Sequence, residues 1–426
     1  MKVLFFNASA KGGAAIAAQR IFKALLPLVP DMQYYSLDGN TDTHFRTMPP
    51  FKAENGANSI VNRLKWSLYY RQLGKITQGK LGKYEKFTLA HLPIETPVPT
   101  DFGMPDLVHL HWTSEMIDYP SFFKSLPKHV PVVWTCHDMN PFTGGCHYTW
   151  GCEGFEKQCQ HCPQLAISGA KDASYQGQQM KLQSLNGHPL HIVGNSHWME
   201  VQARKSSVFG SALSFQTIHN PLNTDEYIPI DKELAKKALG LPLTAKVIAF
   251  GAERFDNERK GFLLLMAALK KVYAQQPDAY CVVFGMGQSI DEAYALPPMR
   301  YIGFVESVWL QRVIYSAADV FVIPSQQEAF GQTALEAMAC GTPAIGFDVG
   351  GICDMIVPGE TGLLAPAANH EALATAITSL LQNNEMRLGM GAKARMFAVE
   401  NFNMLRQGEQ YFELYKTAVA KGKCNV

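Results

Sequence analysis

Two glutamates, Glu328 and Glu336, are separated by seven residues that include Phe330-Gly331-Gln332-Thr333. If a strand ends at Ile323 and a helix begins near Gly331, Glu328 precedes the helix and Glu336 lies about one and a half turns along it. The free N–H groups and partial positive charge of a helix N-terminus suit a diphosphate. Two carboxylates beside it can accept hydrogen bonds from sugar and ribose hydroxyls. An N-terminal charge plus an ordinary surface glutamate explains the pair alone equally well.

Two cations, Arg254 and Lys260, flank a polar loop that directly follows a predicted strand. Cleavage of a glycosyl–diphosphate bond leaves growing negative charge on the leaving phosphate. Two fixed cations can stabilise that charge without a divalent metal. Taken alone, the loop also fits a solvated charged segment.

The N-terminal half offers a glycine pair and a histidine. Gly12 and Gly13 lie between the first predicted strand and helix, where a phosphate or sugar can approach closely, although a tight turn fits equally well. His137 follows the strand at 130–135, so it should lie at the carboxyl end, where a neutral imidazole can hydrogen-bond a sugar hydroxyl. His109 and His111 alternate on one strand and fit either the core or a binding cleft.

Short apolar runs bounded by turn residues predict buried strands that hold these groups. In the N-terminal half they lie at 3–7, 107–111, 130–135 and 191–194. In the C-terminal half they lie at 246–251, 280–284, 301–303, 320–323 and 344–347. Helical spacing occurs at 14–26 and 262–275. This alternation predicts two doubly wound, Rossmann-like α/β domains that face each other across a cleft.

The domain boundary is expected at the turn-rich stretch that begins Asn220-Pro221. Residues 1–220 form the first predicted domain, with a Cys-rich loop at 136–163, and residues 221–400 form the second. Residues 401–426 are predicted to form a helix that packs back on the N-terminal domain. The length of 426 residues also favours two domains.

Composition excludes several classes of protein. A formal net charge of +1 argues against nucleic-acid binding, which requires a strongly basic face. No signal peptide or stretch of membrane-spanning length is apparent. The odd count of nine cysteines does not fit a secreted disulfide framework. These observations predict a cytoplasmic protein.

The motifs of the C-terminal half together resemble the retaining glycosyltransferases of the GT4 family, which have the two-domain GT-B fold. The resemblance covers about residues 245–365 and rests on Arg254, Lys260-Gly261, Pro324-Ser325 and the segment from Glu328 to Glu336. It implies that Arg254 and Lys260 hold the donor diphosphate, that Glu328 faces the transferred sugar and that Glu336 binds the ribose.

Other site residues also follow from the resemblance. It implies that His137 lies near the transferred sugar and that no catalytic metal is required. The leaving diphosphate itself then helps to deprotonate the acceptor hydroxyl, and no carboxylate is identified as a nucleophile. The implied donor-binding residues are Gly12, Gly13, Phe304, Phe330, Gly331, Gln332, Thr333 and Glu336.

Four cysteines fall within seventeen positions and end in a C-x2-C pair: Cys146, Cys152, Cys159 and Cys162. Thiolates at such spacing can close a tetrahedral zinc site that folds a polar loop. Reduced buried thiols and a redox pair are the alternatives, and structural zinc is favoured. A subset of GT4 enzymes of bacterial surface-polysaccharide synthesis looks similar in this loop.

A basic aromatic stretch spans residues 62–86. It carries seven cations against the single acid Glu85, and the cations are Arg63, Lys65, Arg71, Lys75, Lys80, Lys83 and Lys86. Such a segment can rest on an anionic bilayer at the inner membrane face. The simpler interpretation, a solvated helix with its apolar face toward the core, is favoured because Gly74, Gly79 and Gly82 interrupt the pattern.

The function predicted from these features is transfer of a sugar from a UDP- or GDP-sugar to a glycan or lipid-linked glycan, in bacterial polysaccharide synthesis. A nucleotide-sugar epimerase or hydrolase on the same fold is the first alternative. A non-catalytic binding protein is the second, and the intact set of charged residues argues against it.

Overall fold

The computed structural model describes residues 1–38, 43–48, 60–79, 84–287 and 296–424. The chain divides into two units, Met1–His219 with Gln407–Val426, and Asn220–Arg406. The boundary expected after residue 220 lies beside the observed one. The C-terminal segment returns to the first unit from Gln407 onward, within a helix that begins at Met404.

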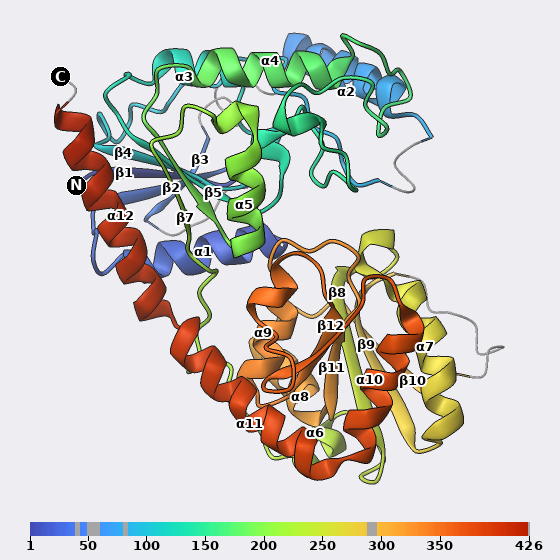
Figure 1. Cartoon of the computed structure of the whole chain (residues 1–426). Coiled ribbons are helices and arrows are strands. Elements are labelled where there is room, and N and C mark those ends of the chain that lie inside the picture. The colour runs from blue at the N-terminus through green and yellow to red at the C-terminus, as the bar shows by residue number, and fades with distance from the viewer. Residues whose placement is uncertain (39–42, 49–59, 80–83, 288–295, 425–426) are drawn as a thin grey trace. The chain divides into compact units, whose positions relative to one another are not determined.

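The first unit is built on a parallel sheet in the order β3-β2-β1-β4-β5-β6-β7 (Figure 1). The continuous apolar runs form its centre, and β1, β4, β5 and β6 are buried along their whole length, as expected for strands covered on both faces. The strands are β1 (Val3–Phe6), β2 (Met32–Ser36), β3 (Phe45–Thr47), β4 (Leu107–Leu110), β5 (Val132–Cys136), β6 (Leu190–Gly194) and β7 (Ser214–Thr217).

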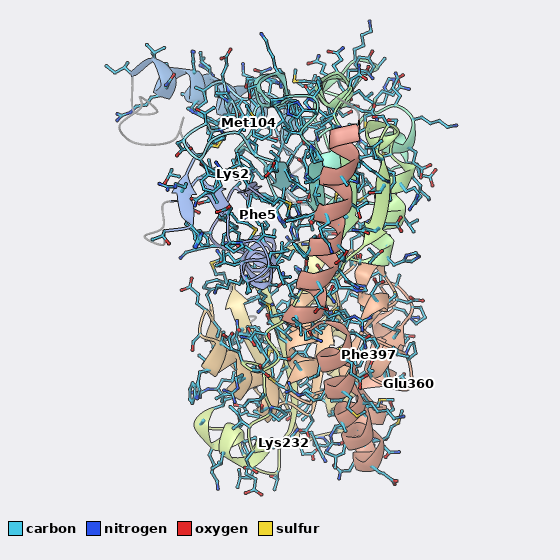
Figure 2. All side chains as sticks on the ribbon, turned by 90° about the vertical axis from the view of Figure 1, so that its left-hand side faces the viewer. Lys2, Phe5, Met104, Lys232, Glu360 and Phe397 are labelled. Carbon is cyan, nitrogen blue, oxygen red and sulfur yellow. The ribbon has the colours of Figure 1, made fainter. Side chains whose placement is uncertain are left out.

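Helices cover this sheet and share its core. Phe5, labelled in Figure 2, stacks on Tyr34 and packs against Phe22 of α1, and the same cluster includes Tyr411 and Tyr415 of α12. The helices of this unit are α1 (Gly13–Leu25), α2 (Ile60–Thr77), α3 (Tyr119–Ser125), α4 (Ala173–Leu185), α5 (His197–Lys205) and α12 (Met404–Cys424), with short 3-10 turns η3 (Asn140–Phe142), η4 (Gly154–Glu156) and η5 (Ser207–Phe209).

The second unit repeats the architecture with a parallel sheet in the order β10-β9-β8-β11-β12-β13. Its strands are β8 (Lys246–Arg254), β9 (Ala279–Met286), β10 (Met299–Gly303), β11 (Val320–Ile323), β12 (Ala344–Phe347) and β13 (Gly362–Ala365). Two separate apolar clusters cover its two faces, one with α7 and α10 and the other with α6, α8, α9 and α11. The helices are α6 (Lys232–Ala238), α7 (Phe262–Gln275), α8 (Val308–Ala317), α9 (Gln332–Ala339), α10 (His370–Gln382) and α11 (Asn384–Asn401), with turns η6 (Glu258–Lys260) and η7 (Gly350–Asp354).

The strand order reverses beside β1 and β4 in the first sheet and beside β8 and β11 in the second. Open α/β sheets bind ligands outside the carboxyl ends of their strands at such a reversal. Gly12 follows β1, while Lys260 follows β8 and Glu328 follows β11. The fold therefore brings the predicted residues of each unit to the edge where a ligand site is expected.

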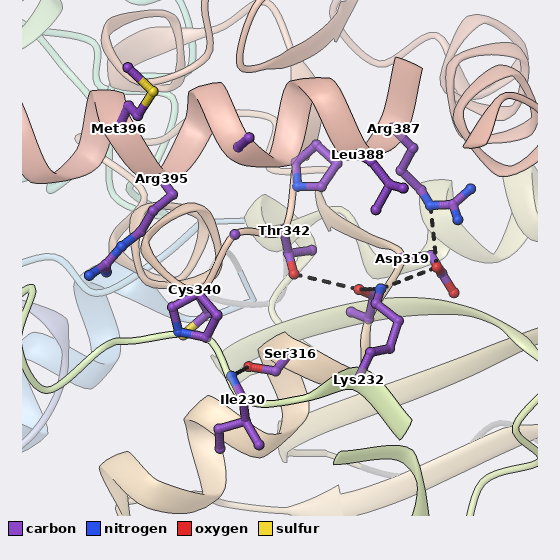
Figure 3. A pocket seen from close by; sticks show the side chains of 15 residues that line it. Ile230, Lys232, Ser316, Asp319, Cys340, Thr342, Arg387, Leu388, Arg395 and Met396 are labelled. Atoms are coloured by element: carbon purple, nitrogen blue, oxygen red, sulfur yellow. Dashed lines mark hydrogen bonds and ion pairs between the residues drawn. The ribbon is translucent and has the colours of Figure 1, made fainter. Parts of the chain in front are cut away.

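The amino edge of the second sheet is held by a buried ion cluster around Asp319, shown close up in Figure 3. Its carboxylate lies 3.2 Å from Lys232 Nζ and 3.3 Å from Arg387 Nε, and it accepts the N–H of Val247 at 2.8 Å. Burial alone would raise the pKa of Asp319, but Lys232 and the Val247 N–H lower it. The adjoining pocket, about 440 Å³, lies at the end of β11 away from Glu328, and its charges are engaged in holding the fold.

None of the helices among the described residues is both long and apolar enough to span a bilayer.

Candidate active site

The carboxylate of Glu328 is the centre of the site in the second unit. It lies between β11 and α9, and Lys260 Nζ donates to its Oε2 at 2.7 Å. Ser325 Oγ donates to the same oxygen at 3.0 Å, and Arg259 Nη1 lies 3.5 Å away. Burial alone would raise the pKa of Glu328, but Lys260 and Arg259 lower it to about 2. Glu328 is therefore an anion at neutral pH that needs its cations.

A tight turn brings Lys260 to this carboxylate. Asn257 caps the turn by accepting the N–H of Arg259 at 3.0 Å, and the turn ends at Gly261 with φ of 69°. A Cβ on Gly261 would lie 1.8 Å from the carbonyl oxygen of Pro324, at the end of β11. Only glycine lets the two loops approach so closely, and their approach joins cation and carboxylate.

Arg259, rather than Arg254, is the second cation beside Glu328. Its guanidinium is buried and donates to the carbonyl oxygen of Gln327 at 2.8 Å. Arg254 is 57% exposed and pairs with Asp256 at 2.6 Å. Arg259 was not among the predicted site residues, although its position directly before Lys260 in a capped turn was a usable signal.

Gly331 is the N-cap of α9, and its φ of 101° lies in the left-handed region. No side chain caps this helix, and the flanking Gln332 and Thr333 are half-buried.

The side chain of Phe330 was expected to line the donor pocket, but the structure places it elsewhere. Its side chain is buried in the core, with its ring centroid 5.8 Å from that of Phe402, so only its backbone can face a ligand.

Glu336, expected to bind the ribose, is a buried residue of α9. Its Oε2 accepts the hydroxyl of Tyr315 at 2.9 Å. Burial and the Glu336 carboxylate hold the pKa of Tyr315 well above its ordinary value, so this hydroxyl remains a donor. Phe304, directly after β10, is 47% exposed and available for stacking.

In the first unit, His137 belongs to a column of buried imidazoles. Its Nε2 lies 2.9 Å from His111 Nδ1, and the His111 ring lies 4.0 Å from that of His109. His109 in turn contacts the hydroxyls of Tyr415 at 2.5 Å and Thr135 at 2.8 Å. His109 and His111 fitted either the core or a binding cleft, and the structure places both in the core, where they are fully buried.

This column fixes the protonation of His137. Burial lowers its pKa to about 4, so the imidazole is neutral at pH 7. His111 Nε2 is buried without a hydrogen-bond partner among the described residues. A buried ring nitrogen that lacks both a proton and a partner costs less free energy than a buried N–H group that has no acceptor. We therefore assign the donated proton to His111 Nδ1, which leaves His137 with its own proton on Nδ1.

Next to His137, Asp138 is held by three donors. Its Oδ2 accepts from His147 Nδ1 at 2.7 Å and Trp112 Nε1 at 2.8 Å, and its Oδ1 accepts the N–H of Asn140 at 2.9 Å. Burial alone would raise the pKa of Asp138, but His147 lowers it.

At the end of β1 in the same unit, Gly12 forms the N-cap of α1 with φ of 90°, and no side chain caps that helix.

The basic aromatic stretch forms α2, which Gly74 does not interrupt. One face packs through Tyr69 and Leu73 against Phe87 and Leu165. The helix carries further aliphatic side chains that are 59–77% exposed, namely Ile60, Val61, Leu64 and Leu68. The helix thus has the expected apolar face toward the core, and this second set of apolar side chains is exposed besides. Lys80, Gly82 and Lys83 of the stretch lie outside the described residues.

The comparisons with known proteins agree with this arrangement. Residues 231–397 match the family described as glycosyl transferases group 1. A D-inositol 3-phosphate glycosyltransferase of Corynebacterium glutamicum is 32% identical over 203 residues, which are 44% of this chain and 47% of that protein. The match thus spans about half of that relative's length.

Solved structures resemble the whole chain. Sucrose-phosphate synthase of Thermosynechococcus elongatus has a TM-score of 0.67 at 21% identity and covers 99% of each chain. HepE of Anabaena, in complex with UDP and glucose, has a TM-score of 0.64 at 16% identity and covers 98% of this chain and 100% of its own. At such identities the likeness establishes the fold.

The fold is therefore GT-B, with two parallel-sheet α/β domains, as the sequence predicted. The match of residues 231–397 to the group 1 glycosyltransferases lies within the second unit, in agreement with the resemblance to GT4 enzymes noted in the sequence.

Proposed function

We propose that the protein transfers a sugar from a nucleotide-sugar donor to a hydroxyl acceptor with retention of the anomeric configuration. The observation that carries this proposal is the cluster of Lys260, Arg259 and Glu328 at the strand reversal of a group 1 glycosyltransferase domain. A buried carboxylate with its own cations is suited to a substrate that is part sugar and part diphosphate.

In this mechanism, Lys260 turns from Glu328 toward the donor diphosphate, where its charge stabilises the leaving group. Glu328 remains ionised and accepts hydrogen bonds from hydroxyls of the transferred sugar, while its charge favours the positive charge that develops at C1. The bond from C1 to the diphosphate oxygen breaks, and the acceptor oxygen bonds to C1 on the same face. The acceptor proton passes to the leaving diphosphate.

The donor proposed first is a UDP-sugar, since HepE, similar in fold, was solved with UDP and glucose. An epimerase or hydrolase would use the same donor but would release free sugar. The relatives' inositol phosphate acceptor is not carried over, because the match covers only 44% of this chain. The acceptor class we propose is a glycan or lipid-linked glycan in bacterial polysaccharide synthesis.

A lipid-linked acceptor is supported by the exposed surface of α2. Its four exposed aliphatic residues lie on a helix whose only charged residues are the exposed Arg63, Lys65, Arg71 and Lys75. Four cations without an acid are complementary to an anionic bilayer, with about 1 kcal/mol of attraction for each cation near the surface. We propose that α2 holds the protein on the inner membrane face.

Donor binding is tested by thermal shift with UDP-, GDP- and ADP-sugars on the full chain. At least one sugar should raise the melting temperature of the wild type, and K260M should lose that rise. K271A serves as the matched control, because Lys271 forms an exposed ion pair with Glu371 elsewhere in the same unit. If no nucleotide sugar shifts the wild type, the proposal is wrong.

Membrane contact is tested by sedimentation with vesicles of phosphatidylcholine, with and without phosphatidylglycerol. The wild type should sediment with the anionic vesicles, and L64E/L68E should lose most of that binding. Leu234, 60% exposed on α6, provides the control L234E. Equal binding of wild type and L64E/L68E would exclude this surface.

A further inference from the structure

Four thiols line one small cavity in the loop that follows β5. The cavity is about 20 Å³, enough for a single water-sized sphere or ion. All four cysteines are free thiols in the structure. Those lining the cavity are Cys146, Cys152, Cys159 and Cys162.

Two backbone N–H groups are directed at these sulfurs, and a buried cation lies near them. The backbone N–H of Gly144 bonds the Cys159 sulfur, and that of Gln164 bonds the Cys162 sulfur. The ammonium of Lys181 is fully buried beside the cluster, where it donates to the carbonyl oxygen of Thr143 at 3.0 Å. N–H donors and a nearby cation are what a cluster of thiolates requires from its surroundings.

The loop has little regular structure of its own to hold its shape. Across residues 146–162, all of which are described, the single regular element is the turn η4. Trp150 and His161 have φ of 52° and 47°, in the left-handed region that non-glycine residues seldom adopt. A cross-link that closes the loop would stabilise such a backbone.

We propose that the four thiolates bind one Zn²⁺ ion, and that the ion holds this loop in place for the acceptor-side residues of the first unit. Four thiolates in a tetrahedral arrangement are a donor set that favours zinc. No group of three or more such ligands is already arranged to hold a metal among the described residues. The proposal therefore requires the thiolates to move closer together when the ion binds.

His147 and Cys162 link this site to the rest of the unit. His147 directly follows Cys146, and its ring holds Asp138 beside His137, while its carbonyl oxygen accepts the N–H of Met139 at 2.9 Å. The loop also supports α2, because Cys162 belongs to the same apolar cluster as Tyr69. Zinc thus positions both the Asp138 turn and the basic helix, whether or not the protein transfers a sugar.

Metal content is the direct test. Elemental analysis of the purified full chain should find about one zinc per chain, and release of the ion by a mercurial reagent should track titration of four thiols. A metal-free, fully stable protein would overturn the proposal. Two internal disulfides, detected by mass, or an iron–sulfur chromophore would overturn it as well.

A variant with a matched control locates the ligands. C152S should lose most of the zinc, whereas C353S should keep it, because Cys353 is exposed and lies in the other unit. If C152S does not fold, wild type loaded with Co²⁺ alone keeps the test open. It should show the thiolate charge-transfer and tetrahedral d–d bands of an S4 site, and their absence would overturn the proposal.

Hydrogen exchange with and without a chelator tests the positioning role. Removal of zinc should increase exchange at least severalfold in residues 139–147 and in α2. Exchange in β8 and β11 of the second unit should not change. Equal exchange in both states would show that the ion does not position these segments.

Discussion

The pair formed by Lys260 and Glu328 allows a quantitative prediction. Its surroundings lower the pKa of Glu328 from 4.5 to about 2 despite burial. That shift corresponds to about 3 kcal/mol, at roughly 1.36 kcal/mol for each pKa unit. K260M leaves the buried carboxylate with Arg259 at 3.5 Å and Ser325 at 3.0 Å. We expect it to lower the free energy of unfolding by about 2–3 kcal/mol, which is roughly 5–10 °C in melting temperature.

The double variant K260M/E328Q removes both charges of this pair and leaves the buried Arg259 guanidinium, which still donates to the carbonyl oxygen of Gln327 at 2.8 Å. Its loss of stability should therefore be smaller than the sum of the losses in the two single variants. Urea unfolding of the wild type, the two single variants and the double variant gives the coupling energy directly. We expect about 2 kcal/mol of coupling at pH 7. The control K271A should change stability by less than about 0.5 kcal/mol.

The direction in which this stabilisation changes with pH follows from the lowered pKa of Glu328. The stabilisation is complete above the unfolded pKa of 4.5 and is lost as the pH falls through about 2. The difference between wild type and K260M should therefore shrink below pH 4.5. A coupling energy near zero at pH 7 would refute the assignment of these residues as a buried ion pair.

Other predictions concern particular residues. His137 binds its proton only below a pKa of about 4, against 6.5 when unfolded, so its own contribution to stability should fall by about 3 kcal/mol as the pH drops from 6.5 to 4. The buried His109 and His111, whose pKa values burial also lowers, should add to the fall in stability. Urea unfolding at pH 7 and pH 5 measures this, and equal stability would contradict it. H111F removes the N–H group that donates to His137 Nε2, so His137 should no longer be held with its proton on Nδ1. The ¹⁵N shifts of His137 should change and kcat should fall, and unchanged shifts would refute the assignment. G331A should cost about 1–3 kcal/mol by thermal unfolding, because a Cβ there is strained at φ 101° and meets Met355. The control G389A, within α11 with open space around its Cβ, should instead be neutral or stabilising by up to about 1 kcal/mol. Equal effects at the two glycines would refute the role of the left-handed turn.

The central strands were predictable because continuous apolar runs are typical of strands buried on both faces. Runs such as Val320–Ile323 were identified without error. Four strands of the described residues were missed: β2 and β7 contain polar residues, β3 is very short, and β13 begins with a glycine that marks a turn. Those strands are β2, with the sequence MQYYS, β3 with three residues, β7 with SFQT and β13 with GLLA.

The site was predictable only in part, because contacts distant in sequence decide it. Lys260 and Glu328 could each be placed at a strand end, but the role of Arg259 depends on the direction of a capped turn. His109 meets Tyr415 across 306 positions, and no local pattern reveals that contact. Phe330 turns into the core, where it meets Phe402.

Sugar transfer itself is the most direct test of the central claim. The full chain is incubated with a radiolabelled nucleotide sugar and a membrane lipid fraction, and the anomeric linkage of the product is read by NMR. We expect nucleoside diphosphate to be released in step with product, retention of configuration, and near-complete loss of transfer in K260M and E328Q but not in K271A. Release of free sugar without a product, or turnover like that of the wild type in K260M and E328Q, would contradict the account.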